Sequence, residues 1–211
     1  MEIKSFVVNP IGENCYILSE GQEGAIIDCG AFERRDWLQI RKYLEEKDIT
    51  LRYALQTHMH FDHVFGLHFV KEEYGLSPLC HIADQQTYNH VPSMAQAFLG
   101  CRTEIELPKV EEYLRDGQKL KLGNKEIEVI HTPGHTPGGL CFYLPEDNIV
   151  FSGDTLFQCS IGRTDFPGGS MSMEIDSIRE RLFTLPNETK VLPGHGGHTT
   201  IGYEKEHNMY F

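Results

Sequence analysis

The sequence lacks the features that mark membrane-spanning and exported proteins. No uninterrupted apolar stretch approaches the length of about 18 residues that a transmembrane helix needs. The first residues, Met1 to Lys4, have neither the apolar run nor the small-residue cleavage site of a signal peptide. These absences predict a soluble, cytoplasmic protein that does not bind a membrane.

Paired cysteines and basic runs are missing as well. No C-x-x-C pair occurs, and in a chain of this length isolated cysteines are expected to be buried, reduced thiols. The six cysteines are at positions 15, 29, 80, 101, 141 and 159. The formal net charge is −12, so the protein should repel polyanions, and nucleic acid is not expected as a partner.

The 211 residues, 40% of them hydrophobic, are sufficient for one domain with a substantial core, spanning residues 1–211. Short β-rich runs alternate with apolar residues at helical spacing, a pattern typical of an α/β fold. The expected strands are Glu2–Val8, Asn14–Ser19, Ala25–Asp28, Arg52–Gln56, Ile127–Ile130, Leu140–Leu144, Ile149–Phe151 and Val191–Leu192. Helical spacing is found in Trp37, Ile40 and Leu44, in Leu67, Val70 and Tyr74, and in Ile175, Ile178 and Leu182.

The segment of about residues 83–115 has weak periodicity, with one expected helix around Met94, Ala97 and Phe98. It predicts an insertion that runs over the core and contributes no core element. Two placements remain open: the insertion covers a functional site, or it packs on a flank.

The strongest chemical signal is the stretch Thr57 to Phe61 followed by Asp62 and His63, directly after an expected strand. Four potential metal ligands occur within these residues, which chance clustering of surface histidines does not explain. They are His58, His60, Asp62 and His63.

Three further candidates stand in the same setting, each in a Gly- or Pro-rich loop just after an expected strand. His135 lies in a TPGHTPG stretch, Asp154 in SGDT and His195 in PGHG. Loops at the ends of strands are where α/β folds place functional groups. Their glycines let a side chain approach an ion without a neighbouring Cβ in the way.

These residues together resemble the ligand series of the metallo-β-lactamase superfamily. The series consists of an H-x-H-x-D-H motif, the histidine of PGHTPG, the aspartate of SGD and the histidine of PGH. The resemblance implies an α/β fold that is a four-layer αβ/βα sandwich, with metals in a groove between the edges of its sheets. One ion would be held by His58, His60 and His135. The second would be held by Asp62, His63 and His195, and Asp154 would bridge the two.

Imidazole and carboxylate ligands suit zinc, and also iron or manganese. The expected cofactors are therefore two divalent metal ions, with zinc preferred. Zinc lowers the pKa of a bound water to about 7, and the ions polarise a substrate carbonyl. Asp62 is predicted to act both as a ligand and as the residue that orients the resulting hydroxide.

Within the superfamily, the DTLF stretch at Asp154 and the tail at 201–208 resemble a short glyoxalase II-like group. This favours a hydrolase of acyl thioesters such as S-lactoylglutathione, with a small-molecule thioester as substrate. The alternative is a persulfide dioxygenase with one iron on His58, His135 and Asp154, because its members share the GRTDF stretch found at residues 162–166. A third interpretation is a metal-binding protein without activity.

Two residues outside the ligand set are candidates for supporting roles. Asp28 follows a strand, and the resemblance implies that it supports a ligand imidazole, although it would equally cap nearby backbone amides. Arg163 is predicted to bind a substrate carboxylate through paired hydrogen bonds. The competing prediction is an internal salt bridge from Arg163 to Asp165.

Overall fold

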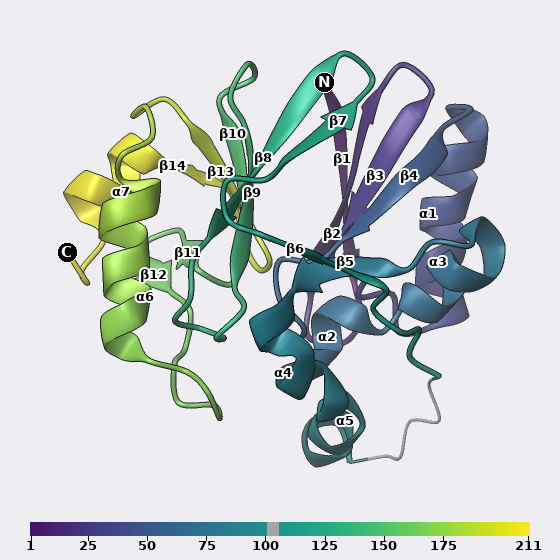
Figure 1. Cartoon of the computed structure of the whole chain (residues 1–211), viewed down its shortest axis with the longest axis horizontal. Coiled ribbons are helices and arrows are strands. Elements are labelled where there is room, and N and C mark those ends of the chain that lie inside the picture. Colours follow the sequence, from purple (N-terminus) through teal and green to yellow (C-terminus); the bar gives the residue numbers. More distant parts are fainter. Residues whose placement is uncertain (101–105) are drawn as a thin grey trace.

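The computed structural model describes residues 1–100 and 106–211, and it contains two mixed six-stranded sheets that face each other (Figure 1). The first sheet has the order β1-β2-β3-β4-β5-β6; β1 to β3 are antiparallel and β3 to β6 are parallel. Its strands are β1 (Glu2–Val8), β2 (Glu13–Glu20), β3 (Glu23–Ile27), β4 (Thr50–Leu55), β5 (Pro78–His81) and β6 (Glu112–Leu114).

The second sheet has the order β14-β13-β10-β9-β8-β7. Its strands are β7 (Lys119–Leu122), β8 (Lys125–His131), β9 (Leu140–Leu144), β10 (Ile149–Gly153), β13 (Lys190–Pro193) and β14 (Thr199–Thr200). A small hairpin of β11 (Leu156–Phe157) and β12 (Ser160–Ile161) stands beside it.

Helices cover the outer face of each sheet, with α1 and α3 on the first and α6 and α7 on the second, while α2, α4 and α5 gather at one end (Figure 1). The helices are α1 (Arg34–Glu46), α2 (Phe61–Val64), α3 (Leu67–Tyr74), α4 (Gln85–Asn89), α5 (Val91–Leu99), α6 (Met171–Ser177) and α7 (Ile201–His207). A 3-10 turn η1 (Ile82–Asp84) precedes α4, and a π-helical segment η2 (Ile178–Leu182) continues α6.

Side chains that alternate along the strands divide the interior into three apolar layers. Ile17 of β2 faces the helices α1 and α3, whereas its neighbour Leu18 faces the second sheet. On β9, Phe142 faces the first sheet and Tyr143 faces η2 and α7. Strands covered on both faces are expected to be apolar throughout. The predicted four-layer αβ/βα sandwich is confirmed.

Part of the segment predicted to carry no core element belongs to the first sheet. Glu112–Leu114 form β6, which pairs in parallel with β5, and Leu114 is buried between the sheets. That part of the expectation is wrong, because a three-residue strand is too short to show a period of two. The helix expected around Met94 is α5. Residues 101–105 of the segment lie outside the described residues, and the insertion as such stays a prediction.

The cysteines follow the expectation with one exception. Cys15, Cys29, Cys80 and Cys141 are buried free thiols, whereas Cys159 is exposed. Its place between β11 and β12, with a backbone φ of +55°, keeps its side chain at the surface. Cys101 lies outside the described residues. In the described chain, every helix is too short or too polar to span a bilayer.

Candidate metal centre

The loops that carry the predicted ligands meet at one end of both sheets. His58 follows β4, while His135, Asp154 and His195 follow β8, β10 and β13. These three strands run in one direction, since β10 and β13 are parallel and β9 is antiparallel to both β8 and β10. The first sheet is tied to this end by the Asn14 amide, which donates to the Gly194 carbonyl at 2.7 Å. Ligands far apart in sequence therefore converge.

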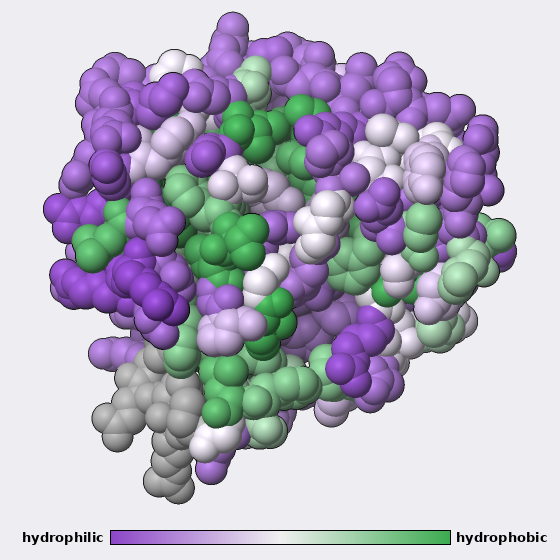
Figure 2. All heavy atoms as spheres, turned by 180° about the vertical axis from the view of Figure 1, so that it is seen from behind, coloured by the Kyte–Doolittle hydropathy of each residue, from purple (hydrophilic) through white to green (hydrophobic). Residues whose placement is uncertain are grey.

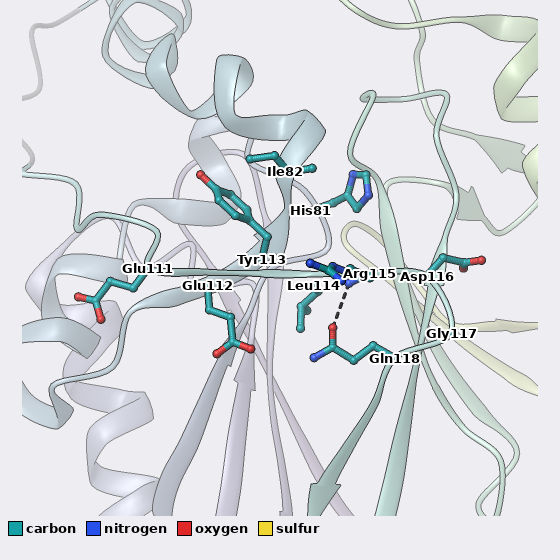
Figure 3. A pocket seen from close by; sticks show the side chains of 10 residues that line it. All are labelled: His81, Ile82, Glu111, Glu112, Tyr113, Leu114, Arg115, Asp116, Gly117 and Gln118. Carbon is teal, nitrogen blue, oxygen red and sulfur yellow. Dashed lines mark hydrogen bonds between the residues drawn. The ribbon is translucent and has the colours of Figure 1, made fainter.

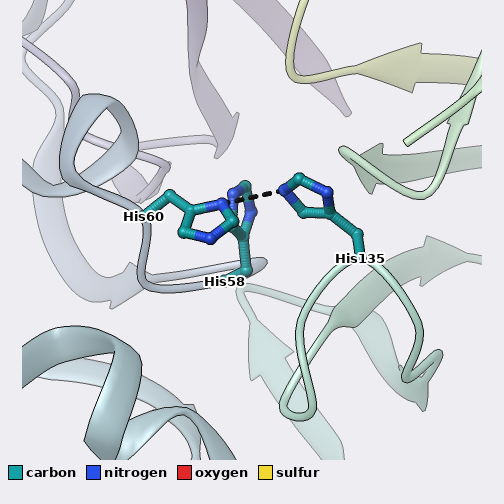
Figure 4. A group of neighbouring side chains, drawn as sticks. All are labelled: His58, His60 and His135. Atoms are coloured by element: carbon teal, nitrogen blue, oxygen red, sulfur yellow. Dashed lines mark hydrogen bonds between the residues drawn. The ribbon is translucent and has the colours of Figure 1, made fainter. Parts of the chain in front are cut away.

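The first group consists of three buried histidines, His58, His60 and His135, whose ligand atoms lie within 4.8 Å of one another. Figure 4 shows the rings converging, with His58 and His60 on one loop and His135 on the facing loop. The Nδ1 atom of His60 lies 2.9 Å from the Nε2 atom of His135. Three imidazoles aimed at one point form a site for a divalent cation.

The second group consists of Asp62, His63 and His195, again with ligand atoms within 4.8 Å. The Oδ2 atom of Asp62 lies 3.2 Å from His195 Nε2. Asp154 stands between the groups: its carboxylate oxygens lie 3.4 Å from His63 Nε2, 3.6 Å from His135 Nε2 and 3.7 Å from His195 Nε2. This is where a carboxylate that bridges two ions would stand.

Unpaired buried atoms indicate that these residues fit metal ions. His58 Nε2, His63 Nε2 and Asp154 Oδ1 are buried and have no hydrogen-bond partner among the residues that the structure describes. Leaving a buried polar group unpaired costs about 1–3 kcal/mol, so native structures rarely do it without a reason. Coordination of a cation by these nitrogen and oxygen atoms supplies that reason.

The protonation states of three predicted ligands, His58, His60 and Asp154, also suit metal binding, whereas the facing carboxylates of Asp62 and Asp154 raise the pKa of His63 and His195. Burial, reinforced by the neighbouring histidines, lowers the pKa of His58 well below its usual value, and burial beside His135 lowers the pKa of His60 to about 3. For Asp154, burial acts to raise the pKa, but the combined interactions with His63, His135 and His195 outweigh it and lower the pKa below its usual value. Neutral imidazole and ionised carboxylate are the forms that bind metals.

Asp28 fulfils both roles considered for it. It lies just after β3 at a backbone φ of +52° and is buried. Its Oδ2 lies 3.1 Å from His63 Nδ1, and its Oδ1 accepts a hydrogen bond from the Thr57 amide at 2.7 Å. It thereby orients the His63 ring so that Nε2 faces the site, and it caps the loop that begins the ligand series.

Two buried acidic residues that hold the ligand loops were not identified from the sequence. Asp84 accepts hydrogen bonds from the Met59 amide at 3.0 Å, the Thr136 hydroxyl at 2.9 Å and the Gly138 amide at 2.7 Å. It therefore joins the His58–His63 loop to the His135 loop. The only sequence signal was its position three residues after the end of β5, and β5 was itself not predicted.

The second residue is Glu174 of α6, which accepts a hydrogen bond from the His135 amide at 2.8 Å. Burial raises the pKa of its carboxyl to about 8. Its neighbour Ile175 is part of the expected helical spacing, but a lone acidic residue beside it gave no sign of burial.

A glycine next to His195 is required by the close packing of the ligands. A Cβ on Gly194 would lie 2.3 Å from Asp154 Oδ1 and 2.6 Å from His63 Cε1, well inside van der Waals contact. The PGH stretch therefore does what its composition predicted, because it lets the backbone pass beside two ligands.

Arg163 forms the salt bridge that the competing prediction described. Its Nε and Nη2 atoms each donate to an Asp165 carboxylate oxygen at 2.7 Å, and the guanidinium lies 4.1 Å from the centre of the Phe166 ring. Its backbone carbonyl accepts a hydrogen bond from His135 Nδ1 at 2.7 Å. The main chain of Arg163 thus orients a ligand, and substrate binding by its side chain stays a prediction.

Two cavities differ in their relation to the candidate centre. A cleft of about 860 Å³ lies around β6 and the turn to β7, lined by residues such as Tyr113, Arg115 and Gln118 (Figure 3). None of the seven predicted ligands lines it. A second cavity, of about 380 Å³, is lined in part by His60.

Comparison with known proteins agrees with the fold and the donor set. The model of the metallo-beta-lactamase superfamily matches residues 8–195. The chain therefore belongs to the metallo-beta-lactamase superfamily, whose members include metal-dependent hydrolases.

Individual relatives are similar over their whole length. Hydroxyacylglutathione hydrolase GloC of Haemophilus influenzae is 35% identical over 218 residues, which cover 100% of this chain and 98% of GloC. The structure of BLEG-1 B3 metallo-beta-lactamase has a TM-score of 0.89 at 32% identity and covers 99% of each chain. The structure of TTHA1623 in a di-iron-bound form has a TM-score of 0.86 at 34% identity, over 99% of this chain and 100% of that one.

Proposed function

We propose that the protein hydrolyses acyl thioesters with two divalent metal ions, zinc in preference to iron or manganese. The observation that carries the proposal is the presence of two groups of three potential metal ligands with the Asp154 carboxylate between them. The similarity of the chain to GloC over its full length supports it. His58, His60 and His135 would hold one ion; Asp62, His63 and His195 would hold the other. When bound, the two ions supply an activated water near neutral pH and stabilise negative charge on the carbonyl oxygen.

The residues of the chain would orient the reactants. Asp62 lies between His63 and His195, with its Oδ2 at 3.8 Å and 3.2 Å from their Nε2 atoms, so its carboxylate can accept a hydrogen bond from the attacking water. In the reaction a C–O bond forms, the C–S bond breaks, and the sulfur leaves as a thiolate that takes up a proton from water. Because a thiolate is a good leaving group, no separate general acid is needed.

The decisive experiment measures thiol release from a panel of thioesters, including S-lactoylglutathione, by protein with its metal content determined. We expect turnover that chelators abolish and that zinc restores, with about two ions per chain, as in other two-metal sites. Oxygen uptake with glutathione persulfide is measured beside it. Uptake without any thioester turnover, with one iron per chain, would instead establish the persulfide dioxygenase.

Two contacts are the reason for testing the persulfide dioxygenase in the same experiment. The stretch Gly162 to Phe166, which suggested the dioxygenase, contacts the metal centre, since the Arg163 carbonyl holds His135 Nδ1 and the Phe166 ring packs on His60 with centroids 5.4 Å apart. A metal-binding protein without activity would give neither thiol release nor oxygen uptake.

A further inference from the structure

The cavity of about 380 Å³ beside His60 is formed mainly by segments that supply no predicted metal ligand. One wall is α4 and α5, and the opposite wall is the loop that follows Arg163. Figure 2 shows hydrophobic residues exposed on the back face at the level of α5. Substrate pockets of about 300–1,000 Å³ are common, so this cavity has room for one modest organic group.

Aromatic contacts join this cavity to the metal centre. Phe166 packs edge-on against both His60 and Phe98, with ring centroids 5.4 Å and 5.7 Å apart. Phe98 of α5 also lies 5.3 Å from Phe61, the residue next to His60. Phe98 is nevertheless 52% exposed, so the packing leaves much of its ring open to a ligand. The cavity therefore reaches His60, one of the predicted metal ligands.

The lining is mainly apolar, although the wall formed by α4 and α5 also carries the polar side chains of Gln86, Thr87, His90 and Ser93. Met94, Ala97 and Phe98 face Pro137 and Phe166. Among the described residues that line the cavity there is no aspartate, glutamate, lysine or arginine. A charged group would lose its hydration here without gaining an aspartate, glutamate, lysine or arginine as an ion-pair partner, which is unfavourable, whereas an apolar group would be stabilised by the removal of its surface from water.

We propose that this cavity binds the acyl group of the thioester, and that the preferred acyl group is uncharged and apolar, of the size of a phenylacetyl or hexanoyl group. The inference rests on the proposed thioester hydrolysis and adds the substrate class. A carrier thiol that bears carboxylates or an ammonium group, as glutathione does, is unsuited to such a lining and extends towards solvent instead.

The first experiment compares phenylacetyl, hexanoyl, acetyl and lactoyl esters of one carrier thiol. We expect kcat/KM for the two apolar esters to exceed that for the lactoyl ester by about tenfold or more, since each methylene in an apolar pocket is worth about that factor. Ala97→Trp fills the cavity and should reduce this ratio towards one. Gln96→Trp, on the same helix but outside the cavity, is the matched control and should keep the ratio.

A second measurement does not depend on turnover. In protein labelled at its methionine methyl groups, the uncharged probe phenylacetamide should shift the NMR signal of Met94, which lines the cavity, and not that of Met209, which is 83% exposed. Ala97→Trp should suppress this shift. The probe therefore reports occupancy of the cavity separately from catalysis.

The outcomes separate this inference from the proposed function. Thioester turnover without acyl preference, together with an unmoved Met94 signal, would overturn the inference and leave the function intact. A shifted Met94 signal with no turnover of any thioester would overturn the function and support the cavity as a site for apolar groups. A preference for the lactoyl ester that Ala97→Trp does not alter would also overturn the inference.

Discussion

The two sheets supply their metal ligands in different ways. The first sheet provides His58, His60, Asp62 and His63 from one loop and the short helix α2. The second provides His135, Asp154 and His195 from three separate loops. A local series needs only one loop to be placed correctly, whereas three solitary ligands need three loops to be held independently.

The hydrogen bonds around the ligands reflect this difference. The ligands that follow the first sheet, here called the first half, are held mainly by Asp28, which bonds to Thr57 and His63. Among the ligands that follow the second sheet, the second half, His135 has its loop held by Glu174. Beside His195, the Tyr16 hydroxyl donates to the Pro193 carbonyl at 2.7 Å. The loops of His135 and His195 are thus each supported from elsewhere in the chain. The geometry of the second half should therefore be more sensitive to distant substitutions.

The largest effect is expected where the two halves meet. Asp154→Ala removes the carboxylate that lies 3.4 Å from His63 and 3.6 Å from His135, so it should weaken both metal sites, whereas His63→Ala should chiefly empty the second. Elemental analysis should find fewer than about one ion per chain in Asp154→Ala and about one in His63→Ala. Two tightly held ions in Asp154→Ala would contradict its bridging place.

The next largest effect is expected at Asp84, because it bonds to loops of both halves. Asp84→Ala leaves the buried Met59 and Gly138 amides without their acceptor, and each such loss costs about 1–3 kcal/mol. We expect the free energy of unfolding to fall by about 2–4 kcal/mol, measured by urea denaturation of the metal-free protein. Asp84→Asn, which keeps an oxygen acceptor, is the control and should lose less. An unchanged unfolding midpoint in Asp84→Ala would show that these bonds contribute little.

A matched pair of substitutions compares the supports of the two halves. Glu174→Ala removes the acceptor for the His135 amide, and Asp28→Ala removes the acceptor for His63 Nδ1. Loss of such a supporting group typically costs about 10–100-fold in metal affinity. Titration with a competing chelator should place the loss at the His58–His60–His135 ion for Glu174→Ala and at the other ion for Asp28→Ala.

A conservative variant distinguishes positioning from general destabilisation in that pair. Glu174→Gln retains an oxygen that can accept from the His135 amide and should recover most of the affinity. If Glu174→Ala and Asp28→Ala weaken both ions equally, the two halves are not held separately, and the contrast between them is wrong.

The smallest effect is expected at Arg163, whose side chain is already paired with Asp165. For a thioester whose carrier thiol bears a carboxylate, Arg163→Ala should raise KM by up to about tenfold and leave the metal content unchanged. The effect is limited because the guanidinium would have to exchange the Asp165 carboxylate for that of the substrate, and this exchange gains less than a new charge-assisted hydrogen bond. Asp165→Asn is the matched variant: it frees the guanidinium and should lower KM. A lower melting temperature with KM unchanged in Arg163→Ala would show that the salt bridge is structural.

The longer elements were predictable from sequence because their patterns repeat. The spacing of Trp37, Ile40 and Leu44 corresponds to the buried face of α1, and the run at 2–8 corresponds to β1. The strands β5, β6, β7 and β14 were not predicted, because elements of two to four residues carry too few positions to show a period. Their pairing in the sheets is decided by the neighbouring strands.

The sequence alone determined which residues are candidate metal ligands, since four donors after one strand and three donors in Gly- and Pro-rich loops have no common structural explanation. It also predicted an α/β fold through its alternating strand and helix patterns, whereas the layered arrangement was implied by the resemblance to the superfamily. Only the tertiary structure brought Asp84 and Glu174 against the ligand loops, paired Arg163 with Asp165, and placed α5 beside His60. The physical reason is that a ligand type is a local property of one residue, whereas a hydrogen bond or a cavity wall depends on segments that only folding brings together.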